Sequence, residues 1–265
     1  MLRTELSVQL VRLRTLIVMA FLAGVPVVAG LTTASHAGHR NGPQGGLFGA
    51  STFSALNHAI ASLAFMVPLL VPLLVALLAT AVGSADRDWG TLRYLYVQPV
   101  SRTRLLTGKL VAVLALTAIT IGCVLAAGVL AGLILFGWHP FHIIGAPSLS
   151  LGDALARALA ASGYTLLCML SMAAIAFTLS LLLPRSAEAL GASLAFLIVA
   201  SILNGHSSLR LLNSLLPVHY WQLWTSLFDA THSAGLPAGI VTQLAWIILM
   251  SAAAVVVVLR RDPAA

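Results

Sequence analysis

The sequence predicts an all-helical integral membrane protein with six membrane-spanning helices. Of its 265 residues, 60% are hydrophobic and only 8% are charged, whereas soluble domains carry about 25% charged residues. The apolar residues form runs long enough to cross a bilayer, and most Lys and Arg residues lie between alternate runs. These observations favour a single transmembrane domain over residues 1–265.

The chain begins with an amphipathic stretch, residues 1–14, in which leucines fall on one stripe of a helix and charged residues surround it. We expect this stretch to lie on the membrane surface before the first span. Six apolar spans are then expected at residues 15–31, 60–82, 105–136, 151–183, 189–203 and 238–258.

Two prolines mark the second span. Pro68 and Pro72 are four residues apart, so we expect them to share a helix face and to kink the span. The carbonyl groups freed by the prolines need other partners, which predicts that this face packs on protein or lines a cavity.

The third and fourth spans carry recognisable packing and capping patterns. Gly128-x-x-x-Gly132 in the third span permits close approach of another helix. Ser150 and Asp153 have the spacing of a capping box that opens the fourth span. Arg157, near the start of that span, is expected to extend towards water.

The stretch from 204 to 228 is too polar to cross a bilayer and too apolar for an ordinary loop. A pair of short helices that dip into the outer leaflet would account for both properties. The two cysteines, Cys123 and Cys168, lie inside apolar runs, which predicts buried thiols rather than a disulfide or a metal site.

The positions of the basic residues predict the orientation of the chain. With the N-terminus inside, six spans place both termini in the cytoplasm and leave three bases outside, namely Arg40, Arg157 and Arg210. The other eleven of the fourteen then face the cytoplasm: Arg3, Arg12, Arg14, Arg87, Arg93, Arg102, Arg104, Lys109, Arg185, Arg260 and Arg261. We therefore expect a multi-pass protein of the cell inner or plasma membrane.

The segment 84–109, between the second and third spans, holds five of the fourteen Lys and Arg residues and two of the seven acids. Ser84 is expected to cap a short helix whose first turn holds Asp86 and Asp88. Pro99 should end that helix. Trp89, Leu92 and Tyr96 give the helix an apolar stripe. By spacing alone, the segment is either a basic interfacial loop or a docking site for a soluble partner.

The residue order within this segment is similar to that of a known family. The runs are Asp86-Arg87-Asp88-x-Gly90-Thr91-Leu92, Gln98-Pro99-Val100-Ser101-Arg102 and Leu105-Leu106-x-Gly108-Lys109. They resemble the coupling region of ABC-2 type permeases, the membrane subunits of type V ABC exporters, with Asp in place of the usual Glu at both acids. The motif covers about a tenth of the chain.

The resemblance implies partners and site residues. Residues 1–14 would be the family's elbow helix, 84–104 its coupling region, and the stretch after the fifth span its short outer re-entrant helices. A separate ATPase subunit would bind ATP and magnesium, and a second permease copy or a paralogue would pack alongside in the bilayer. Coupling to the ATPase would fall to Asp86, Asp88, Trp89, Gly90, Thr91, Leu92, Arg93, Tyr96, Pro99 and Arg102. The substrate path between the second and fifth spans would involve Phe65, Met66, Pro68, Pro72 and Phe196.

The chain shows no catalytic motif of its own. Thr107-Gly108-Lys109 fails as a phosphate-binding loop, because Thr103 stands where the loop needs Gly and Leu110 replaces the Ser or Thr that would hold magnesium. No nucleophile elbow or zincin motif is present. We expect a transport subunit without enzymatic activity, bound cofactor or nucleic-acid partner.

All eight histidines fall on the expected outer side. His139 and His142 have a spacing that could point both imidazoles at one metal ion. No cysteine or acid nearby completes a set of ligands, so we expect no metal site. His139 and His142 are the two residues to test if a metal ion does bind.

The expected function is ATP-driven export of an apolar or amphipathic substrate such as a drug, antibiotic, lipid or peptide. Two alternatives remain open. The chain could move a metal or sulphur species for metalloenzyme maturation, or it could be a non-transporting membrane sensor coupled to an ATPase.

Overall fold

The computed structural model describes residues 12–36, 50–88, 102–143, 148–206, 210–228 and 235–260. These parts of the chain are helical and hold no β-strand beyond one isolated antiparallel bridge between Phe141 and Leu149. The amphipathic stretch 1–11 lies outside the described residues, and so do residues 89–101.

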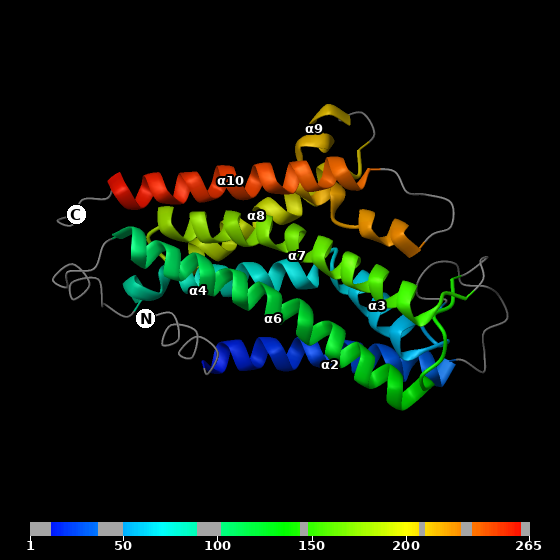
Figure 1. Cartoon of the computed structure of the whole chain (residues 1–265). Coiled ribbons are helices and arrows are strands. Elements are labelled where there is room, and N and C mark those ends of the chain that lie inside the picture. The colour runs from blue at the N-terminus through cyan, green and yellow to red at the C-terminus, as the bar shows by residue number, and fades with distance from the viewer. Residues whose placement is uncertain are drawn as a thin grey trace.

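Six of the described helices are long and apolar enough to cross a membrane, as the sequence predicted. They are α2 (Leu13–His36), α4 (Leu70–Asp88), α6 (Arg102–Phe136), α7 (Leu151–Leu182), α8 (Ser186–Asn204) and α10 (Leu236–Arg260). The six run side by side as a bundle, with α2 and α10 at opposite edges (Figure 1). This arrangement is that of a multi-pass membrane protein.

The second span differs from its prediction. It is not one kinked helix over 60–82 but two helices, α3 (Ala55–Met66) and α4, separated by a turn at residues 67–69. Pro68 lies in this turn and has no N–H to continue the helix, which explains the break. Pro68 is exposed while Pro72 is buried, so the two prolines do not share a face as expected.

Helix α7 is at the centre of the bundle and packs against α4, α6, α8 and α10. In both α4 and α7, 72% of the most apolar stretch is buried, compared with 22% in α8 and 11% in α10. The described residues leave most of the apolar surface of α8 and α10 uncovered, which suits a lipid environment.

The glycine pair in α6 makes the close helix contact that its spacing suggested. A Cβ added at Gly128 would lie 2.7 Å from the Cα of Ala59, and one at Gly132 would lie 2.8 Å from the Cα of Ala55. Small residues on α3 therefore face small residues on α6, and the two backbones approach directly.

The described residues between α8 and α10 form three short helices, where a pair was expected. They are α9 (Arg210–Leu215) and two 3₁₀ helices, η3 (Pro217–Tyr220) and η4 (Leu223–Phe228). Trp221 and Trp224 are buried.

Ser150 caps α7 by accepting a hydrogen bond from the backbone N–H of Asp153, as the capping pattern predicted. Both cysteines are free thiols.

Arg157 does not extend into water as expected. Its guanidinium donates a 2.8 Å hydrogen bond to the carbonyl of Leu227 at the end of η4. The reason is that a carbonyl at the end of a short helix lacks an intrahelical partner, and a nearby arginine can supply one.

Candidate functional site

The candidate site lies at the end of the bundle where α4 ends and α6 begins. The end of α7, the starts of α2 and α8, and the end of α10 lie at this same end of the molecule (Figure 1). The described parts of the motif, residues 84–88 and 102–109, therefore lie at the same end of the bundle as the end of the central helix α7.

The start of the motif, residues 84–88, is folded differently from our expectation. Ser84 does not cap a new helix, because α4 continues without interruption to Asp88 and Ser84 is fully buried within it. Asp86 and Asp88 thus lie in the last turn of a helix, where the helix dipole disfavours negative charge. Nearby positive charge is needed to offset this arrangement, and the structure supplies it from Arg87 and Lys109.

Lys109 of α6 forms an ion pair with Asp86 of α4. Its Nζ lies 2.7 Å from Asp86 Oδ2, and it also donates a 3.2 Å hydrogen bond to the backbone carbonyl of Val82. The Lys109 side chain is 4% exposed and that of Asp86 is 20% exposed. A buried ammonium group requires such partners, because desolvation of an unpaired charge is strongly unfavourable.

Arg87, the next residue along α4, binds the end of α7. It donates to the backbone carbonyls of Leu183, at 2.6 Å, and of Ser180. The Ser180 carbonyl has no intrahelical donor, because the residue four positions later is Pro184, which lacks an N–H. The guanidinium replaces that donor and also places positive charge at the helix C-terminus, where the dipole favours it.

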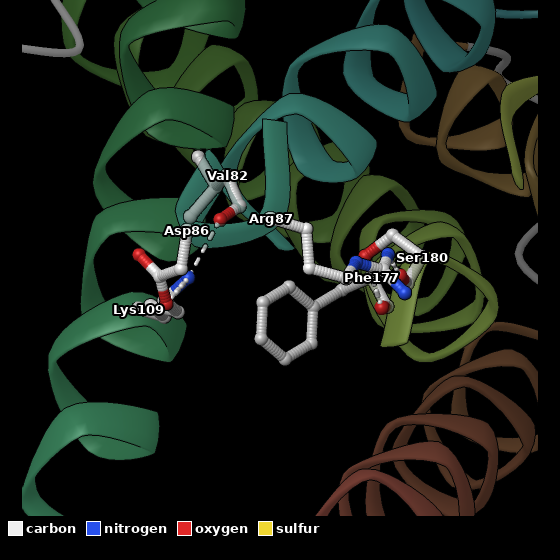
Figure 2. Close-up of polar contacts among 6 residues, drawn as sticks. All are labelled: Val82, Asp86, Arg87, Lys109, Phe177 and Ser180. Atoms are coloured by element: carbon white, nitrogen blue, oxygen red, sulfur yellow. Dashed lines mark hydrogen bonds and ion pairs between the residues drawn. The ribbon is translucent and has the colours of Figure 1, made fainter. Parts of the chain in front are cut away.

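Asp86 and Arg87 therefore point in opposite directions from the end of α4, one towards α6 and the other towards α7 (Figure 2). One turn earlier, α4 and α7 are in direct contact at Gly83. A Cβ there would overlap the Ser180 hydroxyl and lie 3.2 Å from Cδ2 of Phe177. We call Asp86, Arg87, Lys109, Ser180 and Leu183 the charged clamp. It fastens α4, α6 and α7 together.

Most of the predicted coupling residues lie outside the described residues: Trp89, Gly90, Thr91, Leu92, Arg93, Tyr96 and Pro99. Asp88 ends α4 and Arg102 begins α6, and their side chains are likewise not described. Asp86 forms its ion pair within the chain, with Lys109.

The sequence prediction did not include Arg87 and Lys109 among the site residues. A base bordering an apolar run is the signal that could have found them, since such a base needs a partner.

The residues predicted for a substrate path are not gathered on one surface. Phe65 and Pro68 are exposed, whereas Met66 and Pro72 are buried. Phe196 of α8 packs instead against Trp246 of α10, with ring centroids 5.8 Å apart. The assignment of these residues to a path stays a prediction.

The opposite end of the bundle is fastened mainly by neutral side chains, with the charged Arg157 described above as an exception. Asn57 of α3 donates to the carbonyl of His142 at 2.8 Å and accepts from its N–H at 3.1 Å. His58, also buried in α3, has its Nε2 3.0 Å from the carbonyl of Pro26 in α2. Together these bonds hold α3 to α2 and to the chain that follows α6.

The short helices at this end are attached in the same way. Tyr164 of α7 donates to the carbonyl of Tyr220, and Gln243 of α10 donates to that of Pro217. Trp246 donates to the carbonyl of Leu215 at 2.8 Å. Each of these donors is uncharged, and each acceptor is a backbone carbonyl in or next to a short helix.

The histidine pair shows no converging ligands. His139 is exposed, while the His142 ring packs against Phe53 with centroids 4.4 Å apart. Within the described part of the chain, no group of three or more His, Cys, Asp or Glu residues could hold a metal ion.

The chain belongs to a family whose function is not known. Residues 45–262, more than half of the chain, match the family described as "Protein of unknown function (DUF2705)". No curated protein matches the chain. The matched region includes all of the charged clamp and five of the six long helices in full.

Proposed function

We propose that this protein is the membrane permease subunit of an ATP-driven ABC exporter. The proposal begins from the resemblance of residues 84–109 to the coupling region of ABC-2 type permeases. The observation that carries it is the charged clamp, which anchors the end of α4 to both α6 and α7. A segment that receives force from a soluble ATPase must be fixed firmly to the spans it moves, and the clamp supplies that attachment.

In this proposal, ATP and magnesium bind in a partner ATPase subunit and the permease itself catalyses no reaction. Two permease copies, or this chain and a paralogue, pack side by side with the ATPases beneath them. The substrate is apolar or amphipathic, in keeping with an apolar bundle. Asp88 and the residues up to Tyr96 dock on the ATPase, and closure of the ATPases moves the spans.

Isolation of the tagged chain from its native membranes in mild detergent tests this function. We expect a nucleotide-binding subunit to copurify and the complex to hydrolyse Mg·ATP in a vanadate-sensitive manner. Leu92→Asp should abolish the association. Leu211→Asp is the matched control, because Leu211 is 88% exposed and lies on α9 at the opposite end of the bundle.

A native preparation that contains no nucleotide-binding subunit and hydrolyses no ATP would show the proposal to be wrong. A sensor kinase in its place would favour the signalling alternative. Loss of the ATPase in both leucine variants would mean that Leu92 has no special role in docking.

The proposed orientation places both termini and the charged clamp in the cytoplasm. Support comes from the bases of the described long helices, which lie at the clamp end except for Arg157. In a chain with Cys123 and Cys168 replaced by alanine, single cysteines at Gly45 and Ala265 should be labelled from outside and inside the cell, respectively. Labelling of both from the same side would contradict this orientation.

A further inference from the structure

Arg87 connects the end of α4 directly to the last turn of the central helix. Its two hydrogen bonds go to carbonyls of Ser180 and Leu183. These carbonyls are main-chain groups, so a movement of Arg87 acts on the helix itself rather than on a flexible side chain. The end of α7 also depends on Arg87, since Pro184 leaves the Ser180 carbonyl without an intrahelical donor.

The contacts around Arg87 restrict movement of the end of α4 relative to α7. A guanidinium is planar and donates from a rigid fork, unlike the flexible ammonium of lysine. At Gly83, one turn before Arg87, α4 and α7 are too close to admit a Cβ without displacing Ser180. On the other side of α4, the Asp86–Lys109 ion pair holds the start of α6 to the same turn. The ends of α4 and α6 are therefore held as one unit against α7.

Helix α7 can pass a movement further into the bundle. Thr178, two residues before Ser180, donates a 2.9 Å hydrogen bond to the carbonyl of Met250 in α10. The same helix packs along α4, α8 and α10. A shift at its clamp end can therefore reach α8 and α10 as well.

We propose that Arg87 is the positioning residue through which movement at the end of α4 is transmitted to α7. The inference rests on the proposed function, because it assumes that a partner ATPase moves this end of α4. It assigns Arg87 to transmission and not to docking: its guanidinium faces the chain's own α7 and is not needed to hold the ATPase.

The test compares four full-length proteins in lipid nanodiscs with the ATPase subunit that copurifies with the native chain. They are the native protein, Arg87→Gln, Arg87→Lys and the matched control Arg185→Gln. Arg185 lies at the same end of the molecule, two residues after Leu183, but its side chain is 82% exposed and pairs only loosely with Glu188, at 3.6 Å. Size-exclusion chromatography first establishes that each variant is folded.

Two quantities are measured in each protein. One is the amount of ATPase subunit retained per permease. The other is the change in hydrogen–deuterium exchange of α7 residues 176–183 when Mg·ATP and vanadate are added. We expect Arg87→Gln to retain the ATPase at the native ratio. Its nucleotide-dependent change in hydrogen–deuterium exchange of α7 should be at least threefold smaller than that of the native protein. Arg87→Lys should recover part of that change, and Arg185→Gln should behave like the native chain.

The outcomes separate the inference from the proposed function. A native preparation without an ATPase subunit overturns both. If the native complex responds to nucleotide and Arg87→Gln responds equally, Arg87 is not the link and only the inference fails. Loss of the ATPase from a folded Arg87→Gln protein also overturns the inference, since Arg87 would then act in docking. Should Arg87→Gln fail to fold, the Arg87→Lys protein decides in the same way, with a reduced response expected and a full native response overturning the inference.

Discussion

The two ends of the helix bundle are fastened by different chemistry. At the clamp end, Asp86, Arg87 and Lys109 hold α4, α6 and α7 together through charged groups. At the opposite end, neutral side chains such as Asn57 and Gln243 bind backbone carbonyls, and Arg157, which binds the Leu227 carbonyl, is a charged exception. Both ends satisfy backbone carbonyl groups, so the two ends differ mainly in whether the donor is charged.

The difference does not make either end loose. A neutral hydrogen bond between buried groups has no favourable hydrated state to exchange into, and opening it leaves a polar atom unsatisfied. At the clamp, Asp86 is partly exposed, but opening its ion pair would leave the buried Lys109 ammonium without a carboxylate partner. We therefore expect the clamp to stay closed and to move as one unit when the end of α4 is displaced.

The largest effect expected is at the ion pair. Asp86→Ala leaves the buried Lys109 ammonium without its carboxylate partner, and we expect a loss of about 3 kcal/mol in the free energy of unfolding. Lys109→Met in the same chain should restore part of that loss, since the unpaired charge is then removed. Reversible unfolding of the purified protein in mixed micelles, followed as a double-mutant cycle, measures both. A double-variant loss equal to the sum of the losses in Asp86→Ala and Lys109→Met alone would show that the pair contributes no coupling.

The next effect concerns the tight contact of α3 with α6 at the end of the bundle opposite the clamp. Gly132→Ala inserts a methyl group against the Ala55 backbone, and backbone atoms cannot move aside cheaply, so we expect a loss of about 2 kcal/mol. Gly122→Ala, in the same helix with open space around it, is the control and should be neutral or slightly stabilising. Similar behaviour of the two variants in the unfolding measurement would contradict a close backbone contact.

A smaller effect is expected where Asn57 holds the chain after α6. Asn57→Leu removes both hydrogen bonds to the backbone of half-buried His142, for an expected loss of about 1.5 kcal/mol. His142→Ala keeps these backbone bonds and removes only the ring contact with Phe53, so its loss should be under about 1 kcal/mol. If the two losses were reversed, the ring and not the amide would be the principal fastening, and the contrast between the two ends would need revision.

The smallest effect is expected for the histidine pair. Titration of the purified chain with zinc or copper should give no difference between the native protein and a variant with His139→Ala and His142→Ala. The physical reason is that the described residues near the pair offer no third ligand. Binding by the native chain that disappears in the double variant would establish a metal site at the end of the bundle opposite the clamp.

Local physical rules allowed much of the fold to be predicted from the sequence. A run of apolar residues must be withdrawn from water, and the six such runs contain six long apolar helices, although the second run is divided into α3 and α4. Ser150 caps α7 because its hydroxyl lies one turn from the N–H it accepts from. Gly128 and Gly132 lie at a helix contact because their spacing repeats on one face. Each of these outcomes depends on residues within a few positions of one another.

Only the tertiary structure decided where the polar groups find their partners. The sequence could not show that α4 continues through Ser84, because the end of that helix is stabilised by Lys109 from α6 and by the contact of Arg87 with α7. Arg87 and Ser180 are 93 residues apart, and no local pattern relates them. Hydropathy and helix period act over a few residues, whereas a buried charge is satisfied by whichever helix packs beside it. The sequence alone therefore determined the helices, and their packing determined the clamp.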